Sequence, residues 1–568
     1  MNPVIASDVD DLVRRFVRPG EHLHLAATQS RPNALTYALC RQFGAAGRFT
    51  ISTTAIHTSA HALTIAGAVR KVIAGFVGDT YPSPRPNPLY RDLSEGTPFD
   101  FEAWSLLSYV QRLMAGAMGL PYAVTGSLAG TDLAEGKGSD LHRIPDPADP
   151  RRQLTLVSAL RPDLTLVHGA CADEAGNVVL FPPLGEGQYA AYAARRGVLA
   201  SVERIVSSEE MASLADRVIV PGQRVLGLCE APMGAHPQSL RAAEAPGVSG
   251  YLEDYEFIED IVDRCAAEER GRDWYREWVL DVGSHDGYLD KLGSARRTAL
   301  RWDGSALPSA ATDLREPAST QERVIVLGAR AVADRVRSGG YDTLLAGIGA
   351  SHMAAWLAAE LLRREGCPVK IASELGAYGF TPEPGDVFLF SLRHAERAEG
   401  LGGIAEILGG MVSANPRALG VLGAAEIDRY GTINTSRSAS GRWLTGSGGA
   451  NDIASSTDCV VVAQASPRRF VPKVSYRTSP GDRVVEVASQ FGRFTRSEST
   501  GEFRLTNVLT SEPAGNPIAL AKVAAELVAQ NTGWAAADLP LGETAVEEPI
   551  TGEELALLRT LDPDGRYR

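Results

Sequence analysis

The sequence has few of the features that mark membrane, secreted or metal-binding proteins. Its 568 residues contain no uncharged apolar run as long as a membrane-spanning helix. The first 21 residues lack the apolar core of a secretory signal. The six cysteines are scattered and form no C-x-x-C pair, which favours buried, reduced thiols over disulfides or a zinc site. We therefore expect a cytoplasmic protein without a metal and without membrane contact.

Positive charge is also scarce. The chain has 56 Lys and Arg against 69 Asp and Glu, a net charge of -13. An acidic surface repels phosphate backbones, so we expect no nucleic-acid partner, although a local basic pocket for a small anion stays open. Arg468, Arg469 and Lys473 beside Phe470 form one small basic cluster. This cluster is either a solvated face or a contact for a phosphate group.

Several catalytic signatures are incomplete. Gly347-Ile348-Gly349 begins a dinucleotide fingerprint, but His352 stands where a third glycine would allow close helix–strand packing. Ser351 lacks the final glycine of a G-x-S-x-G elbow. His57 and His61 lack the glutamate of a zinc-binding helix, and we interpret them as surface histidines. A nicotinamide-binding protein therefore remains only as an alternative hypothesis.

Short apolar strands alternate with amphipathic helices along the chain. A strand is predicted at 22–27 before a helix at 31–43, and another at 343–349 before a helix at 351–364. Further strands are predicted at 369–373, 387–392 and 459–463. This alternation predicts parallel sheets covered by helices, an α/β fold. Continuous apolar strands such as CVVVA are typical of sheets buried on both faces.

Two similar turns indicate a repeat. Residues 172–177 (ADEAGN) and 427–434 (IDRYGTIN) each follow an apolar strand and contain D-x-x-G, a turn sequence. We infer two related open parallel-sheet α/β domains in tandem. The expected organisation is a first domain at 1–302, a polar linker at 303–320, a second domain at 321–540 and a loosely attached acidic tail at 541–568.

Two segments can carry chemistry. A predicted strand ends at Ser373-Glu374 and is followed by Gly376. A carboxylate at the carboxyl end of a strand, next to a glycine, lies where α/β folds bind ligands, although a solvated loop acid fits the position equally well. The glycine-rich segment at 446–450 exposes backbone N–H groups that can hold an oxyanion or phosphate, or it is simply a structural turn.

In their order along the chain, these segments resemble the family I CoA-transferases of the glutaconate and 3-oxoacid type. Residues up to about 302 are similar to an α subunit, and residues from about 321 to 540 to a β subunit. The α-like markers are ADEAGN at 172–177, VERIV at 202–206 and APMGAHP at 231–237. The β-like markers are SELG at 373–376, LGAAEIDRYGTIN at 422–434 and GSGGAND at 446–452.

The resemblance implies an enzyme with Glu374 as the catalytic nucleophile. CoA would move from an acyl-CoA to a free carboxylic acid by ping-pong chemistry, through a glutamyl anhydride and a glutamyl-CoA thioester. Coenzyme A is then a substrate, with no permanently bound cofactor and no metal, and we expect a homo-oligomer, a dimer or a tetramer. The implied CoA-binding and oxyanion residues are Gly446, Gly448, Gly449 and Ala450. The implied substrate-pocket residues are Ser373, Gly376, Tyr378, Gln29 and Glu102.

Two positions depart from the family pattern. Leu375 replaces the usual asparagine after the catalytic glutamate, and 26–29 (AATQ) replaces a Gly-Gly-Phe-like segment. These changes leave CoA-thioester hydrolysis or decarboxylation on the same scaffold as the alternative. Glu102 is a candidate acid for such a reaction, but it is more simply explained as an acid at the start of a helix.

Overall fold

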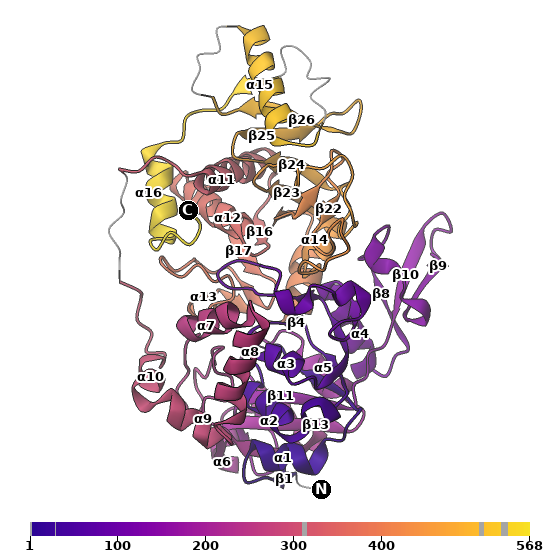
Figure 1. Cartoon of the computed structure of the whole chain (residues 1–568), viewed down its shortest axis with the longest axis vertical. Helices are drawn as coiled ribbons and strands as arrows, with labels where there is room; N and C mark the ends of the chain where they lie inside the picture. The colour runs from indigo at the N-terminus through magenta and orange to yellow at the C-terminus, as the bar shows by residue number, and fades with distance from the viewer. Residues whose placement is uncertain (1–2, 29, 309–314, 511–515, 535–543) are drawn as a thin grey trace.

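The computed structural model describes residues 3–28, 30–308, 315–510, 516–534 and 544–568. The chain forms two α/β halves stacked along the long axis of the molecule (Figure 1). The first half comprises residues 3–302 and the second half residues 315–568. Of the predicted linker, residues 303–308 and 315–319 contain no helix or strand, and 309–314 lie outside the described residues. This agrees with two domains in tandem.

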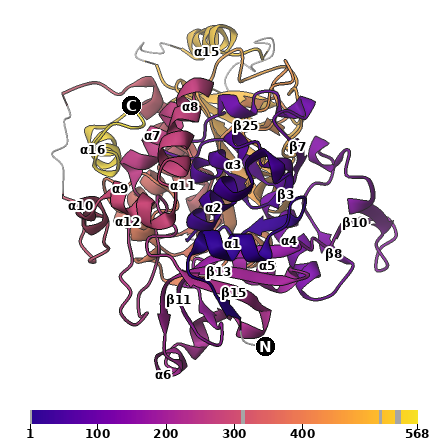
Figure 2. The same cartoon turned by 60° about the horizontal axis from the view of Figure 1, so that its bottom comes forward.

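The first half is built on a sheet whose eight main strands are all parallel to their neighbours. Their order is β1 (Val4–Ile5), β15 (Val225–Glu230), β13 (Gly197–Val206), β11 (Leu164–Asp173), β2 (His22–Leu25), β3 (Phe49–Ser52), β5 (Val69–Ala74) and β7 (Asp100–Ala103). Every residue of the central strand β11 is buried. Helices α1 (Val9–Phe16) and α2 (Asn33–Phe43) cover one face, and α5 (Gly187–Ala193) covers the other (Figure 2).

The smaller strands of the first half lie outside this path. β12 (Val178–Val179) pairs antiparallel with β11 and with β14 (Val218–Val220). The strands β8 (Tyr122–Thr125), β10 (Gln153–Ser158) and β9 (Leu141–Pro145) form a separate antiparallel sheet. This sheet projects to one side of the molecule in both views (Figures 1 and 2).

The second half is built on a mixed sheet. Its strands run in the order β19 (Gly400–Leu401), β18 (Ala377–Tyr378), β17 (Lys370–Ser373), β16 (Thr343–Ala346), β20 (Ala418–Leu422), β23 (Asp458–Val462), β24 (Val484–Ala488), β25 (Gly492–Arg496), β26 (Phe503–Val508) and β27 (Ala545–Val546). Five neighbouring strands of this sheet are parallel to one another: β17, β16, β20, β23 and β24. Antiparallel pairs flank them on both sides. The predicted parallel sheet is therefore the centre of a larger one.

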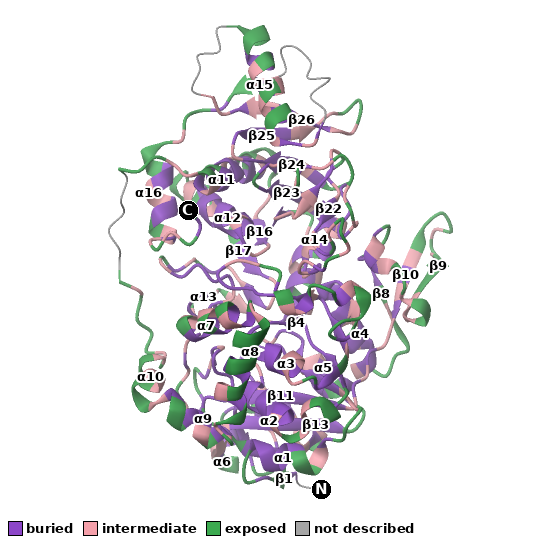
Figure 3. Ribbon diagram, in the orientation of Figure 1, coloured by how far each residue is buried: buried purple, intermediate pink, exposed green. Residues whose placement is uncertain are grey.

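Helices cover both faces of this second sheet. α11 (Thr320–Gly339) and α12 (Ala350–Arg364) pack together on one face, and α14 (Ala450–Ser456) lies on the other. The resulting cores occupy the interior of each half (Figure 3). None of the helices in the described part of the chain is long and apolar enough to cross a membrane. Five cysteines are buried and Cys367 is exposed, all of them unbonded.

The repeated turn has the same geometry in both halves. The Gly176 N–H donates to the Asp173 carbonyl at 2.9 Å, and the Gly431 N–H donates to the Asp428 carbonyl at 2.9 Å. Both glycines have a left-handed backbone, with φ of 86° and 81°, which side chains with a Cβ rarely adopt. In both turns the aspartate carboxylate also accepts a backbone N–H four residues later. The prediction of two structurally related halves is thus supported at the level of hydrogen bonds.

The strand predicted at 387–392 does not form. These residues make a buried loop that leads into the short helix α13 (Leu392–Ala395). Asp386 accepts the Phe388 N–H at 3.1 Å and the Ser391 hydroxyl at 2.5 Å, which bends the backbone away from an extended conformation. The apolar run at 387–392 therefore predicted a strand where a loop forms, because the bend of the backbone depends on the polar side chains of Asp386 and Ser391.

The prediction of a loosely attached tail is wrong for residues 544–568. Helix α16 (Gly552–Leu561) packs against α11, and its Arg559 donates to Glu322 at 2.8 and 3.0 Å. Both side chains of this ion pair are only 2% exposed. Tyr567 is buried as well. The segment is acidic because its carboxylates pair with arginines of the second half, among them Arg330, which binds Glu547 and Glu554.

Arg559→Ala should destabilise the second half. Removing the Arg559 guanidinium leaves the Glu322 carboxylate buried with less positive charge beside it. We expect this to lower the free energy of unfolding by about 3 kcal/mol. Urea unfolding should show a lower midpoint for this variant. The matched control is Arg363→Ala, which breaks an exposed pair with Glu360 and should cost less than about 1 kcal/mol. Equal midpoints for the two variants would contradict a structural role for the packed tail.

Candidate active site

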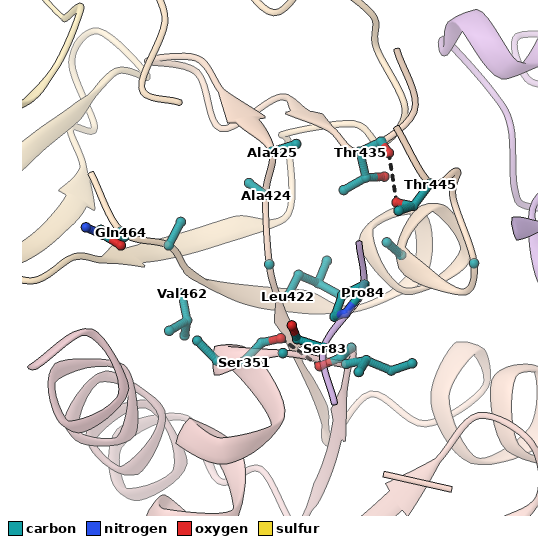
Figure 4. A pocket seen from close by; sticks show the side chains of 18 of the residues that line it. Ser83, Pro84, Ser351, Leu422, Ala424, Ala425, Thr435, Thr445, Val462 and Gln464 are labelled. Carbon is teal, nitrogen blue, oxygen red and sulfur yellow. Dashed lines mark hydrogen bonds between the residues drawn. The ribbon is translucent and has the colours of Figure 1, made fainter. Parts of the chain in front are cut away.

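Glu374 follows β17 directly and lies at the carboxyl end of the second sheet. A cavity of about 780 Å³ opens there. Its lining includes the segments that follow β16, β20 and β23, namely 347–351, 422–425 and 462–464. Ser83 and Pro84 of the first half lie beside Ser351 and Leu422 in this cavity (Figure 4). This is the position where open α/β sheets bind ligands, here closed on one side by the other half of the chain.

The carboxylate of Glu374 touches the glycine-rich segment. Its Oε2 accepts the backbone N–H of Gly449 at 3.1 Å. A Cβ on Gly449 would lie 2.2 Å from that same oxygen, so a side chain there would displace the Glu374 carboxylate from this contact. Gly376 is required for a similar reason, because a Cβ there would lie 2.3 Å from the Gly402 carbonyl oxygen. The two glycines near the acid therefore allow close packing around it.

Burial controls the charge of Glu374. Desolvation, and after it the negative charge of Asp452, raise its pKa to about 7, while the Gly449 N–H acts in the opposite direction. Asp452 itself lies on α14 and is 1% exposed. It accepts the Leu107 N–H at 2.9 Å and the Ser127 hydroxyl at 2.6 Å. Its own pKa rises to about 6, chiefly because of burial. Glu374 is consequently a carboxylate that is readily ionised, but only weakly solvated, near neutral pH.

The first half of the chain holds the glycine-rich segment in place. The Gly448 N–H donates to the Gly75 carbonyl at 3.0 Å, and the Leu106 N–H donates to the Gly448 carbonyl at 3.0 Å. The Val77 N–H donates to the Thr445 carbonyl at 2.8 Å. The partner of Glu374 is thus positioned by backbone hydrogen bonds that cross between the halves.

The four residues expected to bind CoA or an oxyanion, Gly446, Gly448, Gly449 and Ala450, all line the large cavity. Each of their N–H groups already has a protein acceptor. The acceptors are the carbonyls of Thr435, Gly75 and Ser447, and the carboxylate of Glu374. The segment therefore lines the cavity, but the binding of CoA or of an oxyanion by these residues stays a prediction.

The described residues among those predicted for the substrate pocket lie outside the lining of both cavities, although Ser373 and Gly376 are close to Glu374 in the chain. Ser373, Gly376, Tyr378 and Glu102 do not line the cavity, and Gln29 lies outside the described residues. Glu102 stands on β7 between Lys71 and Arg112. Burial alone would raise the pKa of Glu102, but these cations outweigh it and hold the pKa at about 2. Its placement gives no support to a role as catalytic acid.

A second, smaller pocket of about 80 Å³ adjoins the large cavity and is also lined by Glu374. It shares Glu374, Phe76, Ile348 and Gly448 with the large cavity. Its further lining includes Thr28, Arg31, Thr54, His57, Leu106, Gln238, Glu253, Leu375, Phe388 and Phe390. Sequence reasoning missed most of these residues, because they come from distant segments that share no motif.

The prediction of two surface histidines is wrong. His57 is 8% exposed and lines the small pocket, and His61 is fully buried between Tyr90 and Asp79. The pKa of His57 falls well below its ordinary value, because burial and then the positive charge of Arg31 disfavour the charged ring. No group of three or more potential metal ligands occurs among the residues that the structure describes.

The large cavity has a distinct charge pattern. Its charged lining residues are Glu374 and the three arginines Arg469, Arg566 and Arg568. Within the described part of the chain, the Arg469 guanidinium donates only to the Gln464 carbonyl, at 3.4 Å, whereas Arg566 pairs with Glu259 and Arg568 lies 3.7 Å from Glu322. Of the predicted basic cluster, Arg469 thus faces the cavity while Arg468 is exposed. The contribution of 566–568 was not predicted, since the tail was expected to be loosely attached.

Comparison with known proteins agrees with this architecture. A family model described as Coenzyme A transferase matches residues 6–230. The chain is similar to one subunit of a 3-oxoadipate CoA-transferase from Pseudomonas knackmussii, with 30% identity over 184 residues, 32% of this chain and 61% of that subunit. It is also similar to the other subunit from the same organism, with 29% identity over 43% of this chain and 93% of that subunit.

The fold comparison covers nearly the whole chain. An acyl-CoA transferase from Escherichia coli O157:H7 has a TM-score of 0.64 over 96% of this chain and 95% of that chain, at 14% identity, which shows a shared fold. The chain spans less than two thirds of the length of the first of the two 3-oxoadipate subunits. The family model over the first half, the similarity to both subunits of one CoA-transferase and the two-half fold in one polypeptide support a fused CoA-transferase, with counterparts of the two subunits in a single chain.

Proposed function

We propose that the protein transfers CoA from an acyl-CoA to a free carboxylic acid, with Glu374 as the nucleophile. The observation that carries the proposal is the position of this carboxylate on the boundary between a large cavity and a small pocket. An acyl-CoA has its thioester between a large nucleotide-bearing part and a smaller acyl part. A single carboxylate between two unequal cavities suits an attack on that bond. The relatives named CoA-transferases support the same activity.

The two cavities suit the two parts of the substrate. The large one, about 780 Å³, falls in the range of about 300–1,000 Å³ usual for ligand sites. Its three arginines can hold the phosphate groups of CoA by charge-assisted hydrogen bonds. The pantetheine arm would then extend along the cavity to Glu374. The acyl group would occupy the small pocket, where Leu375, Phe388 and Phe390 contribute apolar surface.

In the first half-reaction the Glu374 carboxylate attacks the thioester carbonyl, the carbon–sulfur bond breaks, and CoA leaves as a thiolate. The thiolate then attacks the glutamyl carbonyl of the resulting anhydride. This step releases the donor acid and leaves a glutamyl-CoA thioester. The acceptor carboxylate repeats these steps in reverse, forming its own anhydride and then its CoA thioester, which regenerates Glu374. Each bond broken is matched by one formed, and no proton is gained or lost.

The Gly449 N–H has a role in each attack on Glu374. It lies 3.1 Å from Oε2 before the reaction begins. When a thiolate or carboxylate attacks the glutamyl carbonyl, negative charge develops on a glutamyl oxygen, and a fixed backbone donor stabilises that charge. Because the first half of the chain fixes the glycine segment, this donor is already positioned.

The expected homo-oligomer and the cytoplasmic location stay predictions.

Glu374→Gln should lower the rate of CoA transfer by at least about 10³-fold, because an amide does not replace the carboxylate nucleophile. The assay measures acceptor-dependent formation of the new acyl-CoA by chromatography, with several acyl-CoA and acid pairs. Glu399→Gln, which removes an exposed acid paired with Lys370, is the matched control and should keep its activity. Full activity of Glu374→Gln would contradict the proposal. Release of free CoA without any acceptor would instead identify the hydrolase alternative, and release of carbon dioxide with the thioester retained would identify the decarboxylase alternative.

The pH dependence of kcat/KM should report the ionisation of Glu374. Its pKa of about 7 in the folded protein means that the nucleophilic carboxylate is lost as the pH falls through about 7. We expect a plateau above that value and roughly a tenfold decrease for each pH unit well below it. Steady-state rates with one acyl-CoA, measured from acid to alkaline buffers, test this. A limb near the ordinary glutamate value would contradict the raised pKa of Glu374.

A further inference from the structure

We propose that Tyr567 is a positioning residue of the large cavity: it holds the loop at 82–84 of the first half against the second half, and so sets the affinity for CoA. The inference rests on the proposed function in one respect, because the large cavity is taken to bind the CoA part of the substrate. Ser83 and Pro84 line this cavity from the first half, and Tyr567 lines it from the second half.

The loop that carries Ser83 and Pro84 is part of the cavity wall. Both side chains lie close to Ser351 of the second half (Figure 4). Pro84 also packs against the turn between β16 and α12, since a Cβ on Gly349 would lie 3.6 Å from the proline Cδ, an ordinary van der Waals distance. A shift of this loop away from the second half would therefore widen the cavity at this wall.

One buried hydrogen bond connects the loop to the second half. The Tyr567 hydroxyl donates to the Pro82 carbonyl at 2.5 Å. No other hydrogen bond reaches the three residues of the loop from any residue that the structure describes. The preceding Tyr81 packs on the rings of Tyr255 and Phe388, which fixes the base of the loop but gives its tip no polar anchor. The position of the tip thus depends on Tyr567.

Tyr567 is itself firmly placed in the second half. Its side chain is buried, and its ring packs edge-on against His352 of α12 with the ring centres 5.6 Å apart. The backbone N–H groups of Arg566 and Tyr567 both donate to the Asp562 carboxylate at 2.8 Å. Asp562 directly follows α16, which packs against α11. Burial raises the pKa of the Tyr567 hydroxyl, so at neutral pH it keeps the proton that it donates.

A second contact of the same segment with the first half is weaker. Arg566 pairs with Glu259 of α7 (Tyr255–Cys265), and its guanidinium lies 5.9 Å from the centre of the Tyr81 ring. The side chains of this ion pair are 34% and 32% exposed. Solvent and salt screen such a pair, which therefore contributes little. The buried bond of Tyr567 is not screened in this way and is the stronger link between the loop and the second half.

The affinity for CoA follows from the fraction of molecules whose loop is in place. Without the Tyr567 hydroxyl, the tip of the loop would also adopt positions away from the second half. The apparent Kd of a ligand rises as the fraction of binding-competent molecules falls. The net contribution of one buried hydrogen bond corresponds to about a tenfold change in such an equilibrium. Glu374 should keep its reactivity, because its Gly449 donor is held by other contacts.

The test measures binding of free CoA to the whole chain by calorimetry. Tyr567→Phe keeps the ring and removes only the hydroxyl, and its Kd for CoA should be about tenfold higher than that of the unchanged protein. The matched control is Tyr430→Phe, which removes a hydroxyl that donates to the exposed Glu502 at 3.1 Å. The Kd of this control should stay within about twofold. Backbone hydrogen exchange at 80–85 should be faster in Tyr567→Phe and should slow again when CoA is saturating.

Steady-state kinetics separate positioning from a general loss of structure. Tyr567→Phe should raise KM for the acyl-CoA by about the same tenfold factor, with kcat and the acid limb of the pH profile unchanged. The inference is overturned if the unchanged protein does not bind CoA, or if Tyr567→Phe binds CoA as tightly as the unchanged protein does. It is also overturned if affinity falls while exchange at 80–85 stays the same. Failure of the proposed function gives another result, full transfer by Glu374→Gln, and leaves the effect of Tyr567 on CoA binding intact.

Discussion

The contact between the Gly449 N–H and the Glu374 carboxylate is the constraint on which the site depends. It brings an acid from one strand end against a backbone segment where a side chain in place of Gly449 would displace the carboxylate. That segment is in turn fixed by hydrogen bonds with Gly75 and Leu106 in the first half. The reactive group of one half is therefore held by the other, which explains why both halves are needed to form one site.

The same contact explains the electrostatics of Glu374. Packing against the interface removes water from the carboxylate and raises its pKa, and the buried Asp452 adds to this effect. A poorly solvated carboxylate is a stronger nucleophile than one in water, and the dry site protects anhydride and thioester intermediates from hydrolysis. Arginines line both the large cavity and the small pocket that share this acid. The acidic protein thus places cations in both cavities beside one nucleophile.

The sequence predicted the parts of this arrangement that depend on local pattern. The strand–helix unit β16–α12, the strand before Glu374 and the paired D-x-x-G turns follow from apolar periodicity and turn chemistry within a few residues. Arg31, His57 and Arg566 could not be found in this way, because their place in the site depends on how distant segments pack. The tail was misjudged for a similar reason: acidic composition does not show that the partners of Glu547 and Glu554 lie on α11.

The most direct test of the account is to trap the covalent intermediate. The protein is incubated with a panel of acyl-CoAs without an acceptor acid, treated with borohydride, and mapped by peptide mass spectrometry. The account predicts reduction of the Glu374 side chain to an alcohol, dependent on acyl-CoA, because a glutamyl-CoA thioester is reducible whereas a free carboxylate is not. Steady release of free CoA with an unmodified Glu374 would contradict it.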